Sequence, residues 1–308
     1  MVLTLVGLGL NDERDISIRG LEAIRTADIV YLENYTATLN VDTCRLERFF
    51  EKPIVLADRD FVEGQAEAML EAAETKRVVC LVVGDPFCAT THADLYLRAR
   101  QRGVTVKVVH NASIMSAVAA SGLQLYRFGE TVSIPFFDGG WKPVSFYEKI
   151  KKNRDNNMHT LCLLDIKVKE QTVENMMKGN NIFEPPRFMT VNTAIEQLLE
   201  AAEMHNDENA KKILAFGLAR VGADDQMIVS GTLEELLNAD LGKPLHSLRP
   251  PQNICSHLLS FLVSGWPPRG GRRNSVLLYH VPCLPADGLV KAQQRILNSR
   301  RSSGRQYN

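Results

Sequence analysis

The first third of the chain alternates between short apolar runs and segments with helical spacing of apolar residues. Four runs of apolar residues predict β-strands, and they cover residues 2–9, 28–33, 78–86 and 105–110. Three intervening segments predict helices, over residues 16–27, 67–77 and 89–103, the last of which closes at a glycine. Strands that alternate with helices in this way are typical of a parallel sheet with helices on both of its faces.

A second set of elements of the same kind follows. Predicted strands cover residues 131–135, 159–168 and 212–221, with a short strand at 245–248, and predicted helices cover residues 143–152, 191–202 and 232–239. The pattern therefore favours an α/β protein of two α/β domains, 1–112 and 113–248, joined near residues 111–130.

Composition is typical of a soluble globular protein. The 308 residues are 45% hydrophobic and 23% charged, which is enough for a substantial core. The apolar start has no preceding basic segment and is followed by acidic NDERD, so we interpret it as a buried strand and not as a signal peptide. No apolar run reaches the eighteen or so residues of a membrane span. The six cysteines lack C-x-x-C spacing, and we expect reduced thiols, no metal site and a cytoplasmic location.

The zero net charge conceals a basic C-terminal segment. Residues 249–308 contain nine Lys and Arg against one Asp, together with six of the thirteen prolines, whereas residues 1–248 carry 27 basic and 35 acidic residues. This composition predicts a tail that is largely disordered, so we expect the folded domains to lie within the first 248 residues.

Ligands of open α/β sheets bind beyond the carboxyl ends of the strands, so the loops that follow the apolar runs are the candidate binding elements. Four loops have suitable residues, namely GLGLND, GDPFCATT, HNASIMSA and LARVGADDQ. The first resembles a dinucleotide-binding turn but does not complete it, because Asp12 stands where the third glycine would be and the helix is delayed to about Ser17. Asp12, Glu13 and Asp15, at the end of this loop and just after it, would also repel a pyrophosphate.

Each of the other loops leaves two interpretations open. Asp85 and Pro86 are typical of a type I turn, or else Asp85 is a fixed carboxylate that faces a cationic or hydroxylated ligand. In HNASIMSA, Asn111 or Ser113 is a helix N-cap, or the N–H groups there hold a carboxylate. A lone histidine such as His246 is more often structural than catalytic.

Taken together, the motifs are specific. The segments VGLGLND, LVVGDPFCATTH, VVHNASIMSAV, NRDNNMHTLCLLDIKVKEQ, EPPRFMTVN and GLARVGADDQ occur in order. The chain resembles the diphthine methyl ester synthases of eukaryotes from residue 1 to about 248. That family has the tetrapyrrole-methylase fold, with two α/β domains and the active site in the cleft between them.

The resemblance implies an S-adenosylmethionine-dependent methyltransferase. Its protein substrate would be translation elongation factor 2, in which a 3-amino-3-carboxypropyl group on a histidine receives methyl groups on its amine and its carboxylate. It also implies a homodimer, no metal, no nucleic acid and no membrane partner. Carried over by position, the contacts to the methyl donor fall on Leu10, Asp85, Cys88, Ser113, Ile114, Leu164, Val221 and His246. No catalytic residue is singled out.

Two departures from the family pattern bear on activity. Cys88 replaces a glycine, so a side chain projects where backbone would approach the donor. After LHSL the family continues with an apolar strand, whereas this chain continues with RPPQ, and we expect an unpaired sheet edge beside Val221 and His246. A non-catalytic relative with the same fold is therefore an alternative, and a methylase that acts on a tetrapyrrole is a third.

Overall fold

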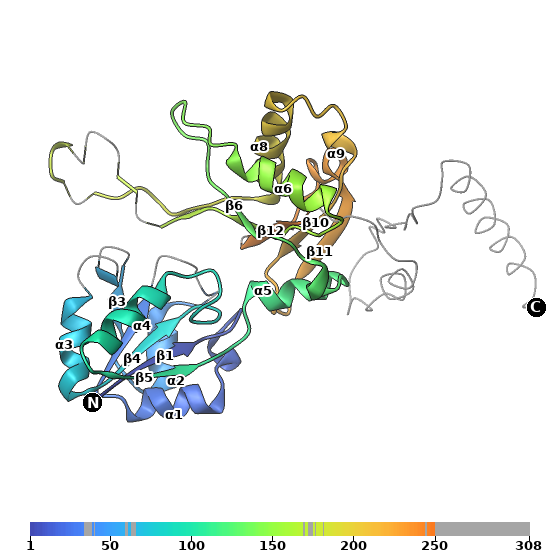
Figure 1. Cartoon of the computed structure of the whole chain (residues 1–308). Helices are drawn as coiled ribbons and strands as arrows, with labels where there is room; N and C mark the ends of the chain where they lie inside the picture. The colour runs from blue at the N-terminus through green and yellow to red at the C-terminus, as the bar shows by residue number, and fades with distance from the viewer. Residues whose placement is uncertain are drawn as a thin grey trace, which may run out of the picture.

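Two five-stranded sheets, each with its own helices, make up the structure (Figure 1), a computed structural model. It describes residues 1–33, 39, 41–58, 61–62, 66–168, 170–171, 175, 177–180, 182–243 and 245–249. The expected tail 249–308 lies outside these residues except for the backbone of Arg249.

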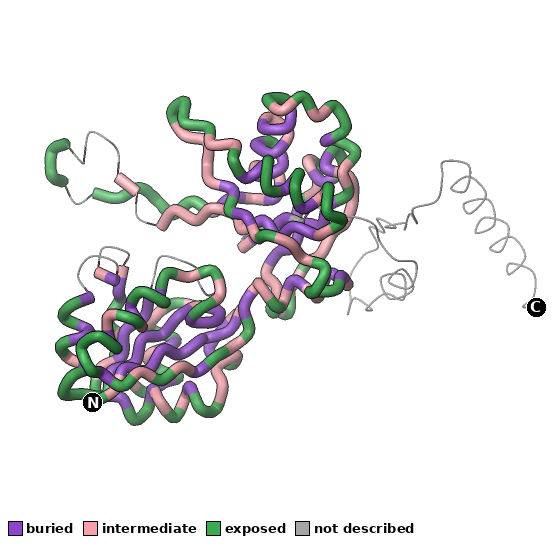
Figure 2. Tube along the Cα trace, in the orientation of Figure 1, coloured by how far each residue is buried: buried purple, intermediate pink, exposed green. Residues whose placement is uncertain are grey.

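The first sheet is parallel throughout and has the order β3-β2-β4-β1-β5. Its strands are β1 (Val2–Gly7), β2 (Ile29–Glu33), β3 (Val55–Ala57), β4 (Arg77–Val82) and β5 (Thr105–Val109). In the central strands β1 and β4 nearly every residue is buried, because helices cover both faces of the sheet (Figure 2). The order places the carboxyl ends of β4, β1 and β5 side by side.

Helices cover the two faces in pairs. Their bounds are α1 (Ile18–Thr26), α2 (Thr43–Phe50), α3 (Glu67–Thr75) and α4 (His92–Gln101). One apolar core combines Leu3 and Leu5 with α3 and α4, and a second combines Val6 with Ile24 of α1 and Phe50 of α2. The predicted start of α1 is confirmed, since the Ser17 hydroxyl accepts a hydrogen bond from Gly20 N at 3.1 Å and caps the helix.

The second sheet is mixed and has the order β11-β10-β12-β7-β6. Its strands are β6 (Val132–Ile134), β7 (Cys162–Leu164), β10 (Leu214–Ala219), β11 (Met227–Thr232) and β12 (His246–Arg249). Only the β6–β7 pair is parallel. The helices of this half are α5 (Ile114–Ala117), α6 (Ser145–Asp155), α8 (Val191–Met204) and α9 (Leu233–Leu236). The expected domain boundary between residues 112 and 113 falls in the connection from β5 to α5 and stays a prediction.

A two-stranded ribbon extends away from the second sheet (Figure 1). It pairs β8 (Ile166–Lys167) with β9 (Arg187–Phe188). The single strand expected over residues 159–168 is therefore wrong. It is divided at Asp165 into β7, which belongs to the five-stranded sheet, and β8, which belongs to the ribbon, because Asp165 N bonds to Ile134 O while Met189 N bonds to Asp165 O.

The short strand β12 lies at the centre of the second sheet and not at its edge. It is antiparallel to β10 on one side and to β7 on the other, with Ala219 opposite His246 and Leu163 opposite Ser247. The unpaired edge expected beside Val221 and His246 is therefore wrong. Arg249, the last described residue of β12, lies opposite Phe216.

Four elements were not expected from the sequence, namely α2, β3, β9 and β11. Strand β3 has three residues, of which Val55 and Leu56 are about half exposed, so it carries no alternation of buried and exposed positions. Across the described helices, none is both long enough and apolar enough to span a membrane.

Candidate active site

Two loops of the first sheet are joined through their backbones where β1 and β4 end. Gly9 N donates to Gly84 O at 3.2 Å and Gly84 N donates to Gly9 O at 2.8 Å. Both glycines have positive φ, of 84° and 77°, a conformation that favours glycine. The glycines of GLGLND therefore let two protein loops approach one another. This structural role does not involve a bound pyrophosphate.

Gly7 is required by close packing. A methyl group at this position would lie 2.5 Å from Gly84 O and 2.8 Å from Cβ of Asn111. The amide of Asn111 fixes the same junction, because its Nδ2 donates to Gly7 O at 2.9 Å and to Asp15 O at 3.0 Å. The carboxyl ends of β1, β4 and β5 are thus held as one rigid platform.

The acidic residues of GLGLNDERD are all engaged within the protein. Asp15 accepts hydrogen bonds from the N–H groups of Leu10 and Asn11, at 3.1 and 2.8 Å. Asp12 pairs with Arg14 at 2.6 Å, and this hydrogen bond lowers the pKa of the Asp12 carboxyl despite partial burial. Arg45 Nη2 lies 2.7 Å from Glu13 Oε1. These carboxylates shape the loop.

The loop after β1 also meets the loop after β10. A methyl group on Gly222 would lie 2.9 Å from Cβ of Leu10, so the LARVGADDQ loop of the second half packs directly on the GLGLND loop of the first. Gly222 has a φ of 94°. The two sheets are therefore in contact beside the site.

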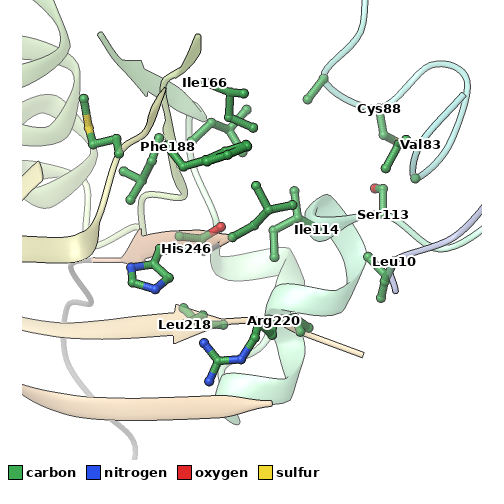
Figure 3. A pocket seen from close by; sticks show the side chains of 18 of the residues that line it. Leu10, Val83, Cys88, Ser113, Ile114, Ile166, Phe188, Leu218, Arg220 and His246 are labelled. Carbon is green, nitrogen blue, oxygen red and sulfur yellow. The ribbon is translucent and has the colours of Figure 1, made fainter. Parts of the chain in front are cut away.

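A cavity of about 190 Å³ lies between the two halves of the chain (Figure 3). Its walls come from the four loops that the sequence indicated, together with the ends of β7 and β12. The lining residues are Gly9, Leu10, Val83, Gly84, Cys88, Ala89, Thr90, Ser113, Ile114, Leu163, Leu164, Asp165, Ile166, Phe188, Met189, Leu218, Arg220, Val221, Leu245, His246 and Ser247. Most are apolar, and few groups carry charge.

Seven of the eight donor-contact residues expected from the resemblance line this cavity. They are Leu10, Cys88, Ser113, Ile114, Leu164, Val221 and His246, which come from both halves of the chain. The tertiary structure therefore brings them together, although no bound molecule tests their role and the assignment stays a prediction.

Asp85 is the eighth residue and does not line the cavity. Its buried carboxylate accepts hydrogen bonds from Phe87 N at 2.9 Å, from Asn111 N at 3.0 Å and from His110 Nδ1 at 2.8 Å. Burial alone would raise the pKa of this carboxyl, but these hydrogen bonds together lower it. Asp85 thus ties the loop after β4 to the end of β5, and a direct contact between it and a ligand remains untested.

His246 is held by two backbone groups. Its Nδ1 accepts from Val191 N at 3.2 Å, so Nε2 carries the proton and donates to Lys243 O at 3.1 Å. Burial lowers the pKa of the ring. The histidine is therefore neutral, and it contributes an apolar ring face to the cavity.

The helix expected from HNASIMSAVAASGL is shorter than its composition indicates. Ser113 is the N-cap and accepts from Met115 N at 3.2 Å, as one interpretation predicted, but α5 has only four residues before it tightens into a 3-10 helix. Four residues provide little helix dipole. The helix dipole therefore adds little to the alternative, in which the N–H groups there hold a carboxylate, and that alternative stays a prediction.

Two lining residues have strained backbones. Ala89 and Arg220 adopt φ of 60° and 50°, where a side chain clashes with its own backbone. The guanidinium of Arg220 holds this geometry by donating to the carbonyl groups of Leu241, Lys243 and Asp225 and by pairing with the Asp225 carboxylate at 2.8 Å. Strain of this kind concentrates at functional sites.

Glu33, which mimics a ribose-binding acid in the sequence, lies outside the cavity lining. Its Oε2 is 3.7 Å from Nε2 of His92, and both side chains are fully buried. Burial lowers the pKa of His92 to about 4. This pair lies at the start of α4, directly after the lining segment 88–90.

Asp165 was not among the residues expected from the sequence. It follows β7 directly and lines the cavity, and its Oδ2 accepts from Phe136 N at 3.0 Å. The rule that ligands bind beyond strand ends would have selected it, had the strand not been expected to continue to residue 168.

Comparisons with known proteins agree with this geometry. The family profile Tetrapyrrole (Corrin/Porphyrin) Methylases matches residues 2–237. The diphthine methyl ester synthase of Bos taurus is 55% identical over 252 residues, which cover 80% of this chain and 88% of the relative. That of Dictyostelium discoideum is 55% identical over 250 residues, covering 80% and 92%.

A solved structure shows the same fold. A crystal structure from Entamoeba histolytica, provisionally assigned as diphthine synthase, has a TM-score of 0.74 and 48% identity and covers 85% of this chain and 96% of that one. The predicted α/β fold class and the family resemblance are both confirmed. The chain belongs to the diphthine methyl ester synthase family of tetrapyrrole methylases.

Proposed function

We propose that the protein is an S-adenosylmethionine-dependent methyltransferase of diphthamide biosynthesis, a diphthine methyl ester synthase. The observation that carries this proposal is the family membership, at 55% identity over 88% of a relative's length. The cavity supports it, because residues of both halves converge there in the arrangement that the resemblance implied.

The chemistry of the cavity fits the methyl donor. S-adenosylmethionine combines a flat heteroaromatic ring and an aliphatic chain joined at a sulfonium with the polar groups of its ribose and its amino-acid end. Ligand sites of this kind are mainly apolar with a small number of placed polar groups. Here Leu10, Ile114, Leu164 and Val221 would cover the apolar parts, and the Ser113 hydroxyl and nearby backbone groups would meet the polar parts.

When bound, the donor supplies a methyl group on a positively charged sulfur. The protein then has to hold the acceptor in line with this group and to exclude water. The paired loops at Gly9 and Gly84 fix one wall of the cavity, and the hydrogen bonds of the Arg220 guanidinium fix the backbone of another. Rigid placement of reacting groups is the main contribution available to an enzyme of this kind. In the described part of the chain, no group of three or more potential metal ligands occurs.

The acceptor that we propose is a modified histidine of translation elongation factor 2. Its 3-amino-3-carboxypropyl group would receive methyl groups on the amine and the carboxylate. The names of the relatives support this choice. We further propose a cytoplasmic location and a homodimer, on the family resemblance.

Methyl transfer to elongation factor 2 tests the proposal. The factor carrying the unmethylated intermediate is incubated with the protein and S-adenosylmethionine, and intact mass is followed by mass spectrometry. We expect successive increments of one methyl group. Calorimetry should show binding of the donor and of its demethylated product. Saturable binding of NAD without binding of the donor, or no mass increase, would refute the proposal.

A second candidate is a non-catalytic form with the same fold. It is favoured by Pro250 and Pro251, which have no N–H to donate to a continuation of β12, and by Cys88 in the cavity lining, where the resemblance implies a glycine. The same assay separates the two candidates, since a non-catalytic form gives no methyl increment even where it binds the elongation factor.

A further inference from the structure

The charge balance of the cavity lining is the starting point. Three lining residues carry ionisable side chains of interest, namely Asp165, Arg220 and His246. His246 is neutral because its Nδ1 accepts a hydrogen bond. The Arg220 guanidinium is paired with Asp225 and bound to three carbonyl groups, so its charge is compensated outside the cavity.

Asp165 is therefore the charge that the lining retains. It is the single acidic residue among the described residues of the lining, and the hydrogen bond assigned to its carboxylate is the one that Phe136 N donates to Oδ2. Its neighbours in the lining include Leu163, Leu164 and Ile166. Asp165 is half-buried among these apolar side chains, so water screens its attraction to a cation less than it would at an exposed position.

The proposed reaction brings two cations to this cavity. The donor carries a positive sulfur, and the amine of the acceptor is an ammonium ion in water at neutral pH. Two like charges in a mostly apolar site repel each other, so an anionic group is required beside them. A neutral primary or secondary amine also donates N–H groups to a carboxylate, so the contact persists when the amine loses its proton.

We propose that Asp165 is the residue that binds the amine of the acceptor. This assignment rests on the proposed function and extends it to the recognition of the substrate. Asp165 is at the break between β7 and β8, where both of its backbone groups are fixed by Ile134 O and Met189 N. This position holds the carboxylate at one place in the wall, which suits a group that orients a small acceptor.

The variants Asp165→Asn and Asp165→Ala separate charge from structure. Asn retains an oxygen that can accept from Phe136 N, whereas Ala does not, so only the Ala variant should lose thermal stability. Asp155→Asn is the matched control, because it removes the same charge from the exposed end of α6. All three proteins are measured as full chains alongside the wild type.

Two readouts beside activity are informative. Donor affinity is measured by calorimetry with S-adenosylmethionine alone. Acceptor affinity is measured with elongation factor 2 that carries the fully methylated amine, whose charge no longer depends on pH. We expect Asp165→Asn to keep donor affinity and melting temperature while it weakens binding of this product, because the quaternary ammonium loses the attraction of the carboxylate. The variant should also lower kcat/KM for the acceptor, whose amine has N–H groups, by about tenfold or more, the effect typical of losing a charged hydrogen bond.

Several outcomes would overturn the assignment. Loss of donor affinity in Asp165→Asn would mean that the carboxylate faces the donor. Unchanged product binding and kcat/KM, with a stability loss confined to Asp165→Ala, would mean that it only holds Phe136. An active wild type with an equally active Asp165→Asn refutes this assignment alone, whereas a wild type that neither binds nor methylates the factor refutes the proposed function with it.

Discussion

Replacement of Gly7 by alanine tests whether the platform beneath the cavity is as closely packed as the structure indicates. The added methyl group would lie 2.5 Å from Gly84 O and 2.8 Å from Cβ of Asn111. Neither atom belongs to a flexible side-chain end, since one is backbone and the other is held through the two hydrogen bonds of the Asn111 amide. The loops after β1 and β4 must therefore move apart.

The expected magnitude follows from two opposing effects. Overpacking of this kind costs about 1–3 kcal/mol, and two rigid contacts favour the upper half of that range. Alanine also restricts the unfolded chain and returns about 0.4–1 kcal/mol. A net loss of about 1–2.5 kcal/mol remains, which corresponds to a decrease in Tm of about 2–10 °C at roughly 2–4 °C per kcal/mol. Donor affinity should also decrease, because Gly84 lines the cavity.

Gly103→Ala is the control for this experiment. Gly103 has a positive φ of 73° with no atom near its missing side chain, so alanine there costs about 1–2 kcal/mol through backbone strain alone. Thermal unfolding and calorimetry with the donor are measured for both variants. The control should lose stability and keep donor affinity. A Gly7→Ala protein with the Tm and donor affinity of the wild type would refute the packing argument.

Three further predictions concern the cavity, the buried histidine and the tail. Cys88→Gly should bind the donor several-fold more tightly by calorimetry, a gain of about 1 kcal/mol from relief of crowding, and unchanged affinity would show that the side chain is tolerated. His92 has a folded-state pKa of about 4, below its unfolded value of about 6.5. The stability that neutral, buried His92 contributes is complete above about pH 6.5 and decreases as the pH falls toward 4. Over this interval the wild-type protein should therefore lose more unfolding free energy than the His92→Gln variant. Equal losses in the two proteins would contradict the burial argument. A chain in which a family-type apolar strand replaces RPPQ should melt about 4–8 °C higher, because Pro250 and Pro251 lack the N–H groups with which that strand would form about two further ladder hydrogen bonds. Equal melting temperatures and equal donor-induced shifts would leave the non-catalytic alternative without its main support.

Much of the local structure follows from the sequence alone. The apolar runs predict β1, β2 and β4 because central strands of a parallel sheet are buried on both faces. The edge strand β5 is predicted although it is largely exposed or half-buried, because its run TVKVV is rich in β-branched residues. The helix starts at Ser17 and Ser113 are also predictable, since a hydroxyl that caps a helix acts within three residues of the chain. The same local reasoning rejects a dinucleotide site at GLGLND.

The tertiary structure decides what each strand pairs with. Strand β12 has four residues and no pattern that distinguishes an edge from a centre, and only its pairing with β10 and β7 places it in the middle of the sheet. The division of residues 159–168 into β7 and β8 has the same origin. The break falls at Asp165 because its backbone N–H and C=O bond to Ile134 and Met189, which are both distant in sequence.

The direction of a side chain at the site is likewise a tertiary property. Asp85 follows β4 of the first sheet and Asp165 follows β7 of the second, and of the two the sequence indicated only Asp85 as a ligand contact. Asp85 turns to His110 and Asn111, which directly follow β5, whereas Asp165 lines the cavity. Sequence periodicity determines which segments become buried strands, because burial is a local preference of apolar residues. Which carboxylate meets a ligand depends on hydrogen-bond partners from other strands, and their positions exist only once the chain has folded.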